Sequence, residues 1–143
     1  MKYEQLNKDW GAEPNSPDPQ IEIDFNSRSL ILIFYLNAFM YENFEEEDKG
    51  ILEFEDCYVF RLGPTNDEGF HKGDCRLSKS GISWGEFYKL EDSAWEIDFP
   101  SDKVMISELD ENKKLNHYLF YFRDQTFECI AERFKFKVLR ANS

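Results

Sequence analysis

The chain has 143 residues, of which 41% are hydrophobic, and its 29 Asp and Glu residues against 17 Lys and Arg residues give a net charge of −12. This length allows one domain whose core needs neither disulfides nor a structural metal. The negative charge repels a phosphate backbone, so it excludes general nucleic-acid binding and favours either simple solubility or a basic protein partner.

The cysteines and the apolar runs predict a cytoplasmic protein. Cys57, Cys75 and Cys129 are odd in number and far apart, which is typical of reduced thiols. The N-terminus has no apolar signal segment, and the most apolar run, residues 30–36, is too short to cross a bilayer. We therefore expect no membrane segment, no metal and no cofactor.

The first nineteen residues differ from the rest of the chain. Tyr3, Leu6 and Trp10 follow a helical spacing, which predicts a short helix or lid. Residues 14–19 contain three prolines, which predict a stiff linker. The expected organisation is a single domain, with the helix and linker over residues 1–19 and a β domain over residues 20–140.

Alternating side chains predict the first hairpin of the β domain. Ile21, Ile23 and Phe25 alternate with polar residues, as in a strand with one buried face. Residues 26–29 suit a turn. Residues 30–36 are apolar on both faces, which predicts a central strand whose two faces are both covered.

A loop and a second long alternating run follow. Residues 37–49 have a mixed character that predicts a long loop or a single helical turn. Alternation returns from residue 51 to residue 62, but Asp56 falls among the apolar positions. Because an unpaired buried carboxylate is costly, we expect a bulge at Asp56; a hydrogen-bonded carboxylate is the alternative.

The remaining strands complete a mainly β prediction. Residues 84–90 and 104–106 suit short strands. Residues 117–123 and the run that starts at Thr126 predict a hairpin with a tight turn. The expected fold is an antiparallel sandwich or a partly open barrel, with the short N-terminal helix outside it.

The last run changes phase near Glu132. Its apolar side chains occupy odd positions up to residue 131 and even positions from residue 134. A strand changes faces in this way only at an extra residue, so we expect a bulge or bend at Glu132, where the chain passes from one sheet to another.

Charge on the outward faces suggests one strand pairing. The run at residues 21–25 shows Glu22 and Asp24 outward, while the last run shows basic residues outward. Opposite charges on neighbouring strands are favourable. We therefore expect these two strands to be neighbours, with the acidic pair facing Arg133, Lys135 and Lys137.

Residues 61–76 concentrate glycines and polar groups between two strand-like runs, as in loops that carry function. An ordered hairpin loop explains them equally, and they match no phosphate-binding glycine pattern. If the loop is a site, His71 is the acid or base. The catalytic candidates are His71, Glu68, Asp67 and Glu86, and the ligand-binding candidates are Arg61, Asn66, Arg76 and Trp84.

The cysteines offer two further kinds of chemistry. Cys75 could be activated as a nucleophile by His71, and Cys57 or Cys129 by His117, although cysteines in apolar runs are usually core residues. His71 and Cys75 lack the tightly spaced partners that zinc sites have, so we expect no metal.

Three segments, residues 61–69, 84–88 and 118–124, resemble those of a small bacterial family of uncharacterised acidic proteins. The resemblance covers most of the chain and implies bacterial origin and a cytoplasmic location. It implies no activity, no ligand and no catalytic residues.

Acidity without catalytic motifs favours a non-enzymatic binding or protein-interaction domain, in its most concrete form an immunity-type inhibitor of a basic toxin. The contact is expected within residues 42–56, at Glu42, Glu45, Glu46, Glu47 and Asp48. The alternative is a small-molecule-binding domain or hydrolase-like enzyme that uses the 61–76 loop. A third hypothesis is a homo-oligomer that forms through exposed aromatic residues such as Phe39 and Phe44.

Overall fold

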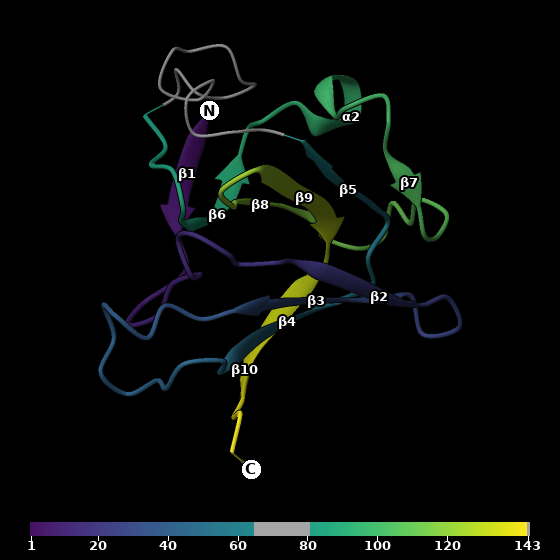
Figure 1. Ribbon diagram of the computed structural model, residues 1–143. Helices are drawn as coiled ribbons and strands as arrows, with labels where there is room; N and C mark the ends of the chain where they lie inside the picture. The colour runs from purple at the N-terminus through teal and green to yellow at the C-terminus, as the bar shows by residue number, and fades with distance from the viewer. Residues whose placement is uncertain (65–80, 143) are drawn as a thin grey trace.

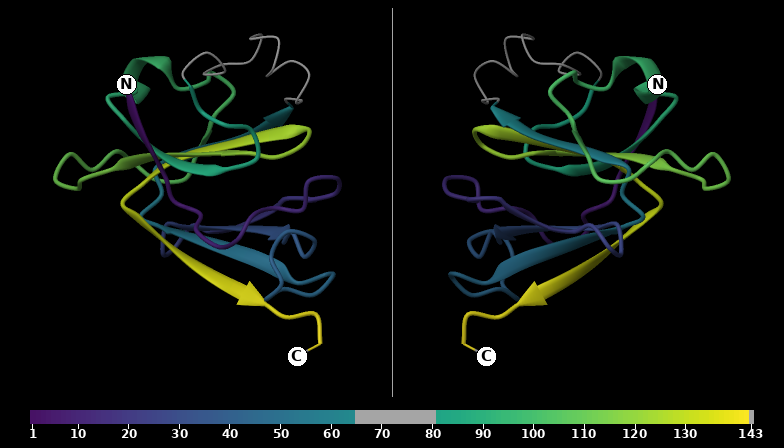
Figure 2. Two further views of the ribbon diagram at one scale, coloured as in Figure 1. Left: turned by 90° about the vertical axis from the view of Figure 1, so that its left-hand side faces the viewer. Right: turned by 90° about the vertical axis from the view of Figure 1, so that its right-hand side faces the viewer.

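The computed structural model describes residues 1–64 and 81–142. It is mainly β, with two antiparallel sheets packed face to face (Figures 1 and 2). The predicted sandwich is thus confirmed, and the described strands do not close into a barrel. None of the helices in the described part of the chain is long and apolar enough to span a membrane.

The first sheet has six strands in the order β1-β6-β8-β9-β5-β7. The hairpin predicted in the C-terminal part of the chain is confirmed, because β8 and β9 pair antiparallel at the centre of this sheet. The strands are β1 (Lys2–Gln5), β5 (Val59–Pro64), β6 (Phe87–Glu91), β7 (Val104–Met105), β8 (Asn116–Tyr121) and β9 (Gln125–Ala131), and a short helix, α2 (Trp95–Asp98), follows β6.

The second sheet has four strands in the order β10-β4-β3-β2, and they are β2 (Gln20–Asp24), β3 (Ser29–Tyr35), β4 (Lys49–Glu55) and β10 (Arg133–Leu139). The hairpin of β2 and β3 is as predicted, and β3 is one of the two inner strands. Its inward side chains are buried, but Ile31 and Ile33 on the other face are only half-buried. We predicted that both faces of this strand are covered, but only the inward face is fully buried.

Aromatic rings fill the space between the sheets. Phe34 and Phe54 from the second sheet pack with Phe87 and Phe120 from the first. Trp10 joins this core and stacks on Phe136, with 4.2 Å between the ring centroids. Since each ring buries a large apolar area, the rings account for a real core in a chain of modest hydrophobic content.

The chain crosses between the sheets at two acidic residues. At Glu132, β9 of the first sheet continues into β10 of the second, as predicted from the phase change (Figure 2). Asp56 has a left-handed backbone, φ 49°, and separates β4 of the second sheet from β5 of the first. The residue that breaks the alternation therefore marks a crossing between sheets, and residues 51–62 form two strands.

One cation joins the two crossings. Lys113 Nζ lies 2.6 Å from the Asp56 carboxylate and 4.0 Å from that of Glu132. Arg28 Nη2 is also 3.1 Å from Asp56. The hydrogen bond from Lys113 is the main cause that holds the pKa of Asp56 below its ordinary value, and the Arg28 charge contributes. Asp56 is thus a paired carboxylate.

The predicted N-terminal helix is wrong. Residues 2–5 form β1, the edge strand of the first sheet, which pairs with β6. A helix of about ten residues with three apolar side chains gains too little from packing to offset its nucleation cost. The free edge of β6 instead offers this segment backbone hydrogen bonds along its length.

The predicted pairing of β2 with β10 is also wrong, because the two strands lie at opposite edges of the four-stranded sheet. The basic side chains of β10 do face acidic partners, but these partners lie on β4. Arg133 pairs with Glu55 at 2.6 Å, and Lys137 lies 3.9 Å from Glu53. The rule of opposite charges was sound, but two strands carried suitable acidic residues and the sequence did not separate them.

Candidate functional site

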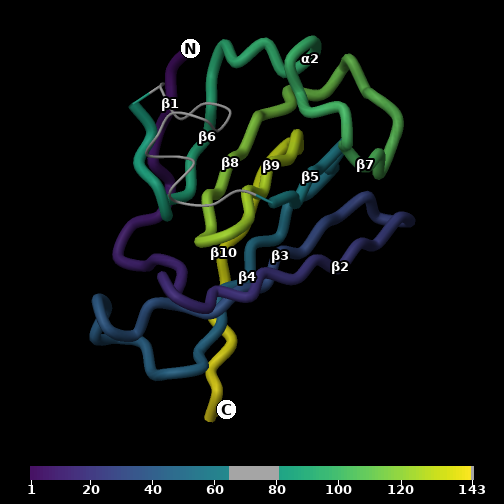
Figure 3. Tube along the Cα trace, turned by 45° about the horizontal axis from the view of Figure 1, so that its top comes forward, coloured from purple at the N-terminus to yellow at the C-terminus, as the bar shows by residue number. Residues whose placement is uncertain are grey.

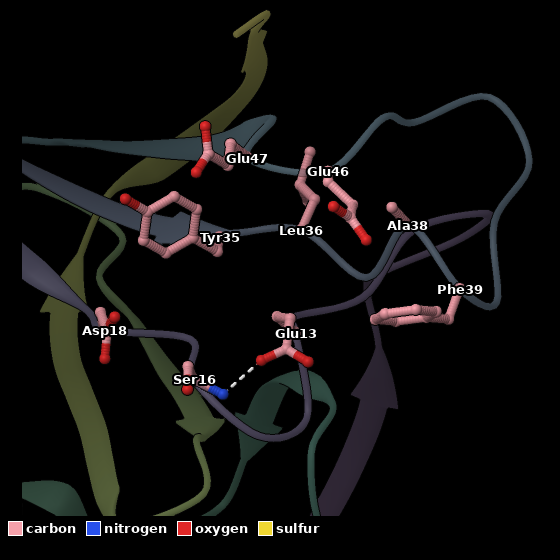
Figure 4. Close-up of a pocket in the computed structure, with 9 residues that line it drawn as sticks. All are labelled: Glu13, Ser16, Asp18, Tyr35, Leu36, Ala38, Phe39, Glu46 and Glu47. Carbon is pink, nitrogen blue, oxygen red and sulfur yellow. Dashed lines mark hydrogen bonds between the residues drawn. The ribbon is translucent and has the colours of Figure 1, made fainter.

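An acidic pocket of about 360 Å³ opens at the end of the second sheet where β3 leaves it. In Figure 4, the side chains of Glu13 and Glu46 approach its middle from opposite sides, between Tyr35 and Phe39. We call it the acidic pocket, and its lining residues are Glu13, Ser16, Asp18, Tyr35, Leu36, Ala38, Phe39, Glu46 and Glu47.

Backbone hydrogen bonds bring the three parts of the acidic pocket together. The segment after β1 runs beside the end of β3, where the Glu13 amide donates to the Tyr35 carbonyl and the Tyr35 amide donates to the Pro17 carbonyl, both at 2.9 Å. On the other side of β3, the Leu36 amide donates to the Asp48 carbonyl at 2.9 Å. The proline-rich segment and the acidic loop, residues 36–48, therefore meet across the end of one strand (Figure 3).

Local turns orient the carboxylates of this pocket. The carboxylate of Glu13 accepts hydrogen bonds from the amides of Asn15 and Ser16, which fixes it at the pocket wall. Asp18 and Glu47 have left-handed backbones, with φ of 46° and 71°. Asp tolerates this conformation, whereas Glu adopts it less readily, so the turn at Glu47 is held by its surroundings.

The acidic pocket concentrates negative charge. Glu13, Asp18, Glu46 and Glu47 form no ion pair with any residue in the ranges 1–64 and 81–142. The nearby cation is Lys49, whose ammonium lies over the Tyr35 ring, 5.1 Å from its centroid. Four carboxylates therefore line one cavity, and none of them has an ion-pair partner in the described part of the chain.

Asp48 belongs to the same loop but has a different role. It is 1% exposed, and its carboxylate accepts hydrogen bonds from Arg140 Nη1 at 2.8 Å and from the amides of Glu45 and Ala141 at 2.9 Å. The Glu45 amide is the largest of the causes that lower the pKa of Asp48. Asp48 thus ties the acidic loop to the C-terminal segment.

Apolar side chains lie at the mouth of the acidic pocket. Phe39 is 78% exposed and the adjacent Met40 is 72% exposed. The Asn37 side-chain oxygen accepts hydrogen bonds from both of their amides at 3.1 Å, which holds this turn. Phe44, which the sequence grouped with Phe39 as an exposed aromatic, is buried against Arg140, so of these two rings Phe39 is the one available for a contact.

Two candidate residues from the sequence, Trp84 and Glu86, line a second cavity of about 410 Å³. Trp84 stacks on Tyr121 with 4.9 Å between the ring centroids. Glu86 Oε2 accepts hydrogen bonds from Gln5 at 2.8 Å and Asn7 at 2.5 Å. The segment that carries Glu13 separates this cavity from the acidic pocket, since Glu13 lines both.

The candidates of the 61–76 loop divide into two groups. Arg61 lies in β5, where its Nε donates to Asp102 at 3.1 Å, away from both cavities. The other candidates lie outside the described residues, so these predictions stay untested; they are Asn66, Asp67, Glu68, His71, Cys75 and Arg76.

The predicted cysteine nucleophiles do not meet a histidine in the described ranges. Cys57 and Cys129 are buried in the core cluster between the sheets, and burial is the main cause that raises the pKa of the Cys129 thiol well above its ordinary value. The strand β8 directs Tyr118 toward that core and His117 toward the opposite face. Cys129 and His117 therefore lie on opposite faces of the first sheet.

The sequence identified the acidic loop but missed its counterpart. Glu46 and Glu47 line the acidic pocket, while Glu42 and Glu45 are exposed residues outside its lining. Glu13 and Asp18 come from the segment that we interpreted as a linker. Their only signal in the sequence is acidic residues flanking prolines, which does not show that the segment lies beside β3.

Comparison of the chain with protein-family models, with curated proteins and with solved structures found no match. The resemblance to an uncharacterised acidic family therefore stays a prediction.

Proposed function

We propose that this domain binds a basic segment of a partner protein, and that the acidic pocket receives a Lys or Arg side chain of that partner. The observation that carries the proposal is the convergence of Glu13, Asp18, Glu46 and Glu47 on one cavity without an ion-pair partner in the described part of the chain. An immunity-type inhibitor of a basic toxin is the concrete form of this function.

The lining suits a long cationic side chain better than a small ion. Leu36, Ala38 and Phe39 supply apolar surface for the aliphatic stem, and the carboxylates supply acceptors for its charged end. The exposed face of Phe39 adds a cation–π contact worth about 0.5–1 kcal/mol at a surface site. The net charge of −12 steers a basic partner toward the molecule, but the cavity gives the contact its position.

A fluorescein-labelled peptide with two arginines separated by glycines tests this proposal. Its association with wild-type protein is compared at low salt with that of a Glu46→Lys/Glu47→Lys variant. We expect the affinity to fall at least ~10-fold, because the variant places two cations where the arginine binds.

The control is Glu96→Lys/Asp98→Lys, two exposed acidic residues of α2 on the first sheet. It changes the net charge by the same amount, so it measures general attraction alone, and we expect a loss below ~3-fold. Equal losses in the two variants would show that the peptide responds to overall charge and would reject the acidic pocket as its site.

The cavity of Trp84 supports a second candidate, a small-molecule-binding site. It combines the stacked Trp84–Tyr121 wall with Glu86 and the Arg123 guanidinium, which donates to the Asn15 carbonyl at 3.2 Å. Its size and its few polar groups around an aromatic wall are typical of ligand cavities. Zwitterionic aromatic amino acids are suitable probes, and saturable quenching of tryptophan fluorescence that Trp84→Phe abolishes would favour this function.

A further inference from the structure

Three side chains joined by hydrogen bonds lie on the outer face of the first sheet, away from both cavities. The Ser93 hydroxyl is 2.7 Å from Nδ1 of His117, and Nε2 of His117 is 2.9 Å from Oε1 of Glu128. We propose that these residues form a hydrolytic triad, in which Ser93 is the nucleophile, His117 its general base and Glu128 the residue that orients the imidazole. The substrate class is esters of small apolar acids.

The fold places the three groups independently of each other. His117 lies on β8 and Glu128 on the neighbouring β9. His117 pairs with Ile130 and Leu119 pairs with Glu128, so His117 and Glu128 are diagonal neighbours on one face of the sheet. Ser93 lies in the turn between β6 and α2, 24 residues earlier in the chain than His117. A nucleophile, a base and an orienting group within hydrogen-bond reach are the geometric signature of an activated serine.

Glu128 determines which ring nitrogen of His117 carries the proton. An ionised carboxylate only accepts hydrogen bonds, so Nε2 of His117 carries a proton and donates it to Glu128. Nδ1 of the neutral ring is then the basic nitrogen, and Ser93 must be the donor. The unprotonated Nδ1 can then take the Ser93 proton, with the two ring nitrogens in the opposite roles to those that they have in the Ser-His-Asp template.

Burial keeps this arrangement in one geometry. The side chains of His117 and Glu128 are 0% and 2% exposed, whereas Ser93 is only half-buried. The base and its orienting group are thus shielded from water while the nucleophile is accessible from the surface. A buried His–Glu pair alone would also stabilise the sheet, but it would not require a serine at the exposed end.

The turn that presents Ser93 is strained. Asp92 and Ala94 on either side of it have left-handed backbones, with φ of 56° and 55°. Alanine lacks the side-chain hydrogen bonds that let Asp or Asn adopt this conformation, so the left-handed backbone of Ala94 is unfavourable. Strained turns of this kind are found where a side chain must be held in one direction for function.

The surroundings of the triad indicate an apolar acyl group. Phe99 packs on the His117 ring at 5.7 Å between centroids, and it belongs to a cluster with the half-buried Trp95 and Tyr58. The exposed Ile97 on α2 extends this apolar surface outward. Such side chains accommodate a short aliphatic or aromatic acyl chain.

The reaction balances with water as the second substrate. The Ser93 oxygen forms a bond to the ester carbonyl carbon while its proton passes to Nδ1 of His117. The carbon–oxygen bond to the alcohol then breaks, and that proton leaves with the alcohol. Water, deprotonated by the same nitrogen, attacks the acyl-serine, releases the acid and returns the Ser93 hydroxyl.

The test is covalent labelling of the full chain by a fluorophosphonate. The Ser93 oxygen would form a bond to phosphorus, fluoride would leave, and His117 would take the proton. We expect an adduct that mass spectrometry places on Ser93, with a rate that rises with pH to a plateau. Ser93→Ala should abolish the adduct, and His117→Gln should slow labelling ~100-fold or more.

Glu128→Gln separates a positioning role from a structural one. It keeps the shape of the side chain but offers Nε2 an amide, which allows the other tautomer, so labelling should slow by at least ~10-fold and the plateau of the pH profile should move. Ser107→Ala is the matched control, because Ser107 is a half-buried serine that donates to the Cys57 carbonyl at 3.1 Å. It should label at the wild-type rate.

Each outcome decides the proposal. An adduct on Ser93 that depends on His117 supports it, as does release of p-nitrophenol from p-nitrophenyl acetate through an acyl group on Ser93. No adduct in the folded wild-type protein, or an adduct whose rate does not change with pH, overturns it. The pH profile needs no variant, so a substitution that unfolds the chain does not remove the test.

Discussion

Two charged surfaces of the second sheet differ in how their charges are used. On the outer face, Arg133 and Lys135 of β10 lie 2.6 and 3.5 Å from the carboxylate of Glu55 on β4. In the acidic pocket at the end of the same sheet, Glu46 and Glu47 have no ion-pair partner in the described part of the chain. On the outer face, the strand register places opposite charges side by side. In the acidic pocket, a loop places carboxylates near each other.

The difference shows which charges are already paired within the molecule and which can attract a partner. Exposed ion pairs contribute little to stability, but they neutralise each other and leave no net attraction for a partner. Like charges held together by backbone hydrogen bonds repel each other until a cation arrives. We therefore assign function to the acidic pocket and structure to the outer face, and three stability predictions test that division.

The largest change is expected at Asp48, the one carboxylate of the acidic loop that is buried and bonded inside the molecule. Asp48→Ala removes the acceptor of the Glu45 and Ala141 amides and one of the acceptors of Arg140, so the Tm should fall by several degrees. Glu47→Ala, at the next position, should leave the Tm unchanged. Thermal unfolding followed by circular dichroism measures both, and equal changes would contradict the division.

Asp48 also gives this prediction a pH dependence. Its folded-state pKa lies below the ordinary value of 3.8, so it stabilises the fold fully above that value, and the contribution is lost as pH falls through the folded pKa. The stability difference between wild type and Asp48→Asn should therefore shrink below about pH 4. A difference that stays constant down to pH 2 would mean that the charge of Asp48 does not act in the fold.

A smaller loss is expected on the outer face of the sheet. Glu53→Gln/Glu55→Gln removes the partners of Lys137, Arg133 and Lys135, so the Tm should fall slightly at low salt. The loss should shrink in about 0.5 M salt, because salt screens exposed pairs. An unchanged Tm at low salt would show that these pairs do not act on stability.

The smallest effect, with the opposite sign, is expected in the acidic pocket. Glu46→Gln/Glu47→Gln changes the net charge by the same amount but removes repulsion rather than attraction. The Tm should therefore rise slightly at low salt and return to the wild-type value in about 0.5 M salt. A fall in Tm would mean that these carboxylates have stabilising contacts, which would contradict an interaction site.

Local pattern predicted the elements whose faces differ clearly in polarity. The alternation in β2 and the polar turn after it predicted the first hairpin, and the phase change at Glu132 predicted the crossing between sheets. Both signals depend on a period of two residues, which the backbone of any strand imposes. The same period located an irregularity at Asp56, but the bulge that we expected there is wrong, because β4 ends before Asp56 and the chain crosses to β5 of the other sheet.

Prediction failed where short segments depend on distant partners. Tyr3, Leu6 and Trp10 match a helical spacing, but the free edge of β6 made residues 2–5 a strand. Half of the acidic pocket was missed for the same reason, since Glu13 and Asp18 reach it only through hydrogen bonds with β3. The Ser93–His117–Glu128 chain was missed as well, because its members come from a turn and two strands.

The sequence by itself determined a mainly β chain, its acidic character and the change of sheet at Glu132, because these follow from composition and from the period of a strand. Only the tertiary structure decided which strands are neighbours, which carboxylates are paired and which converge on a cavity. Those properties depend on contacts between segments far apart in the chain, and charge or polarity at one position does not specify the partner that will face it.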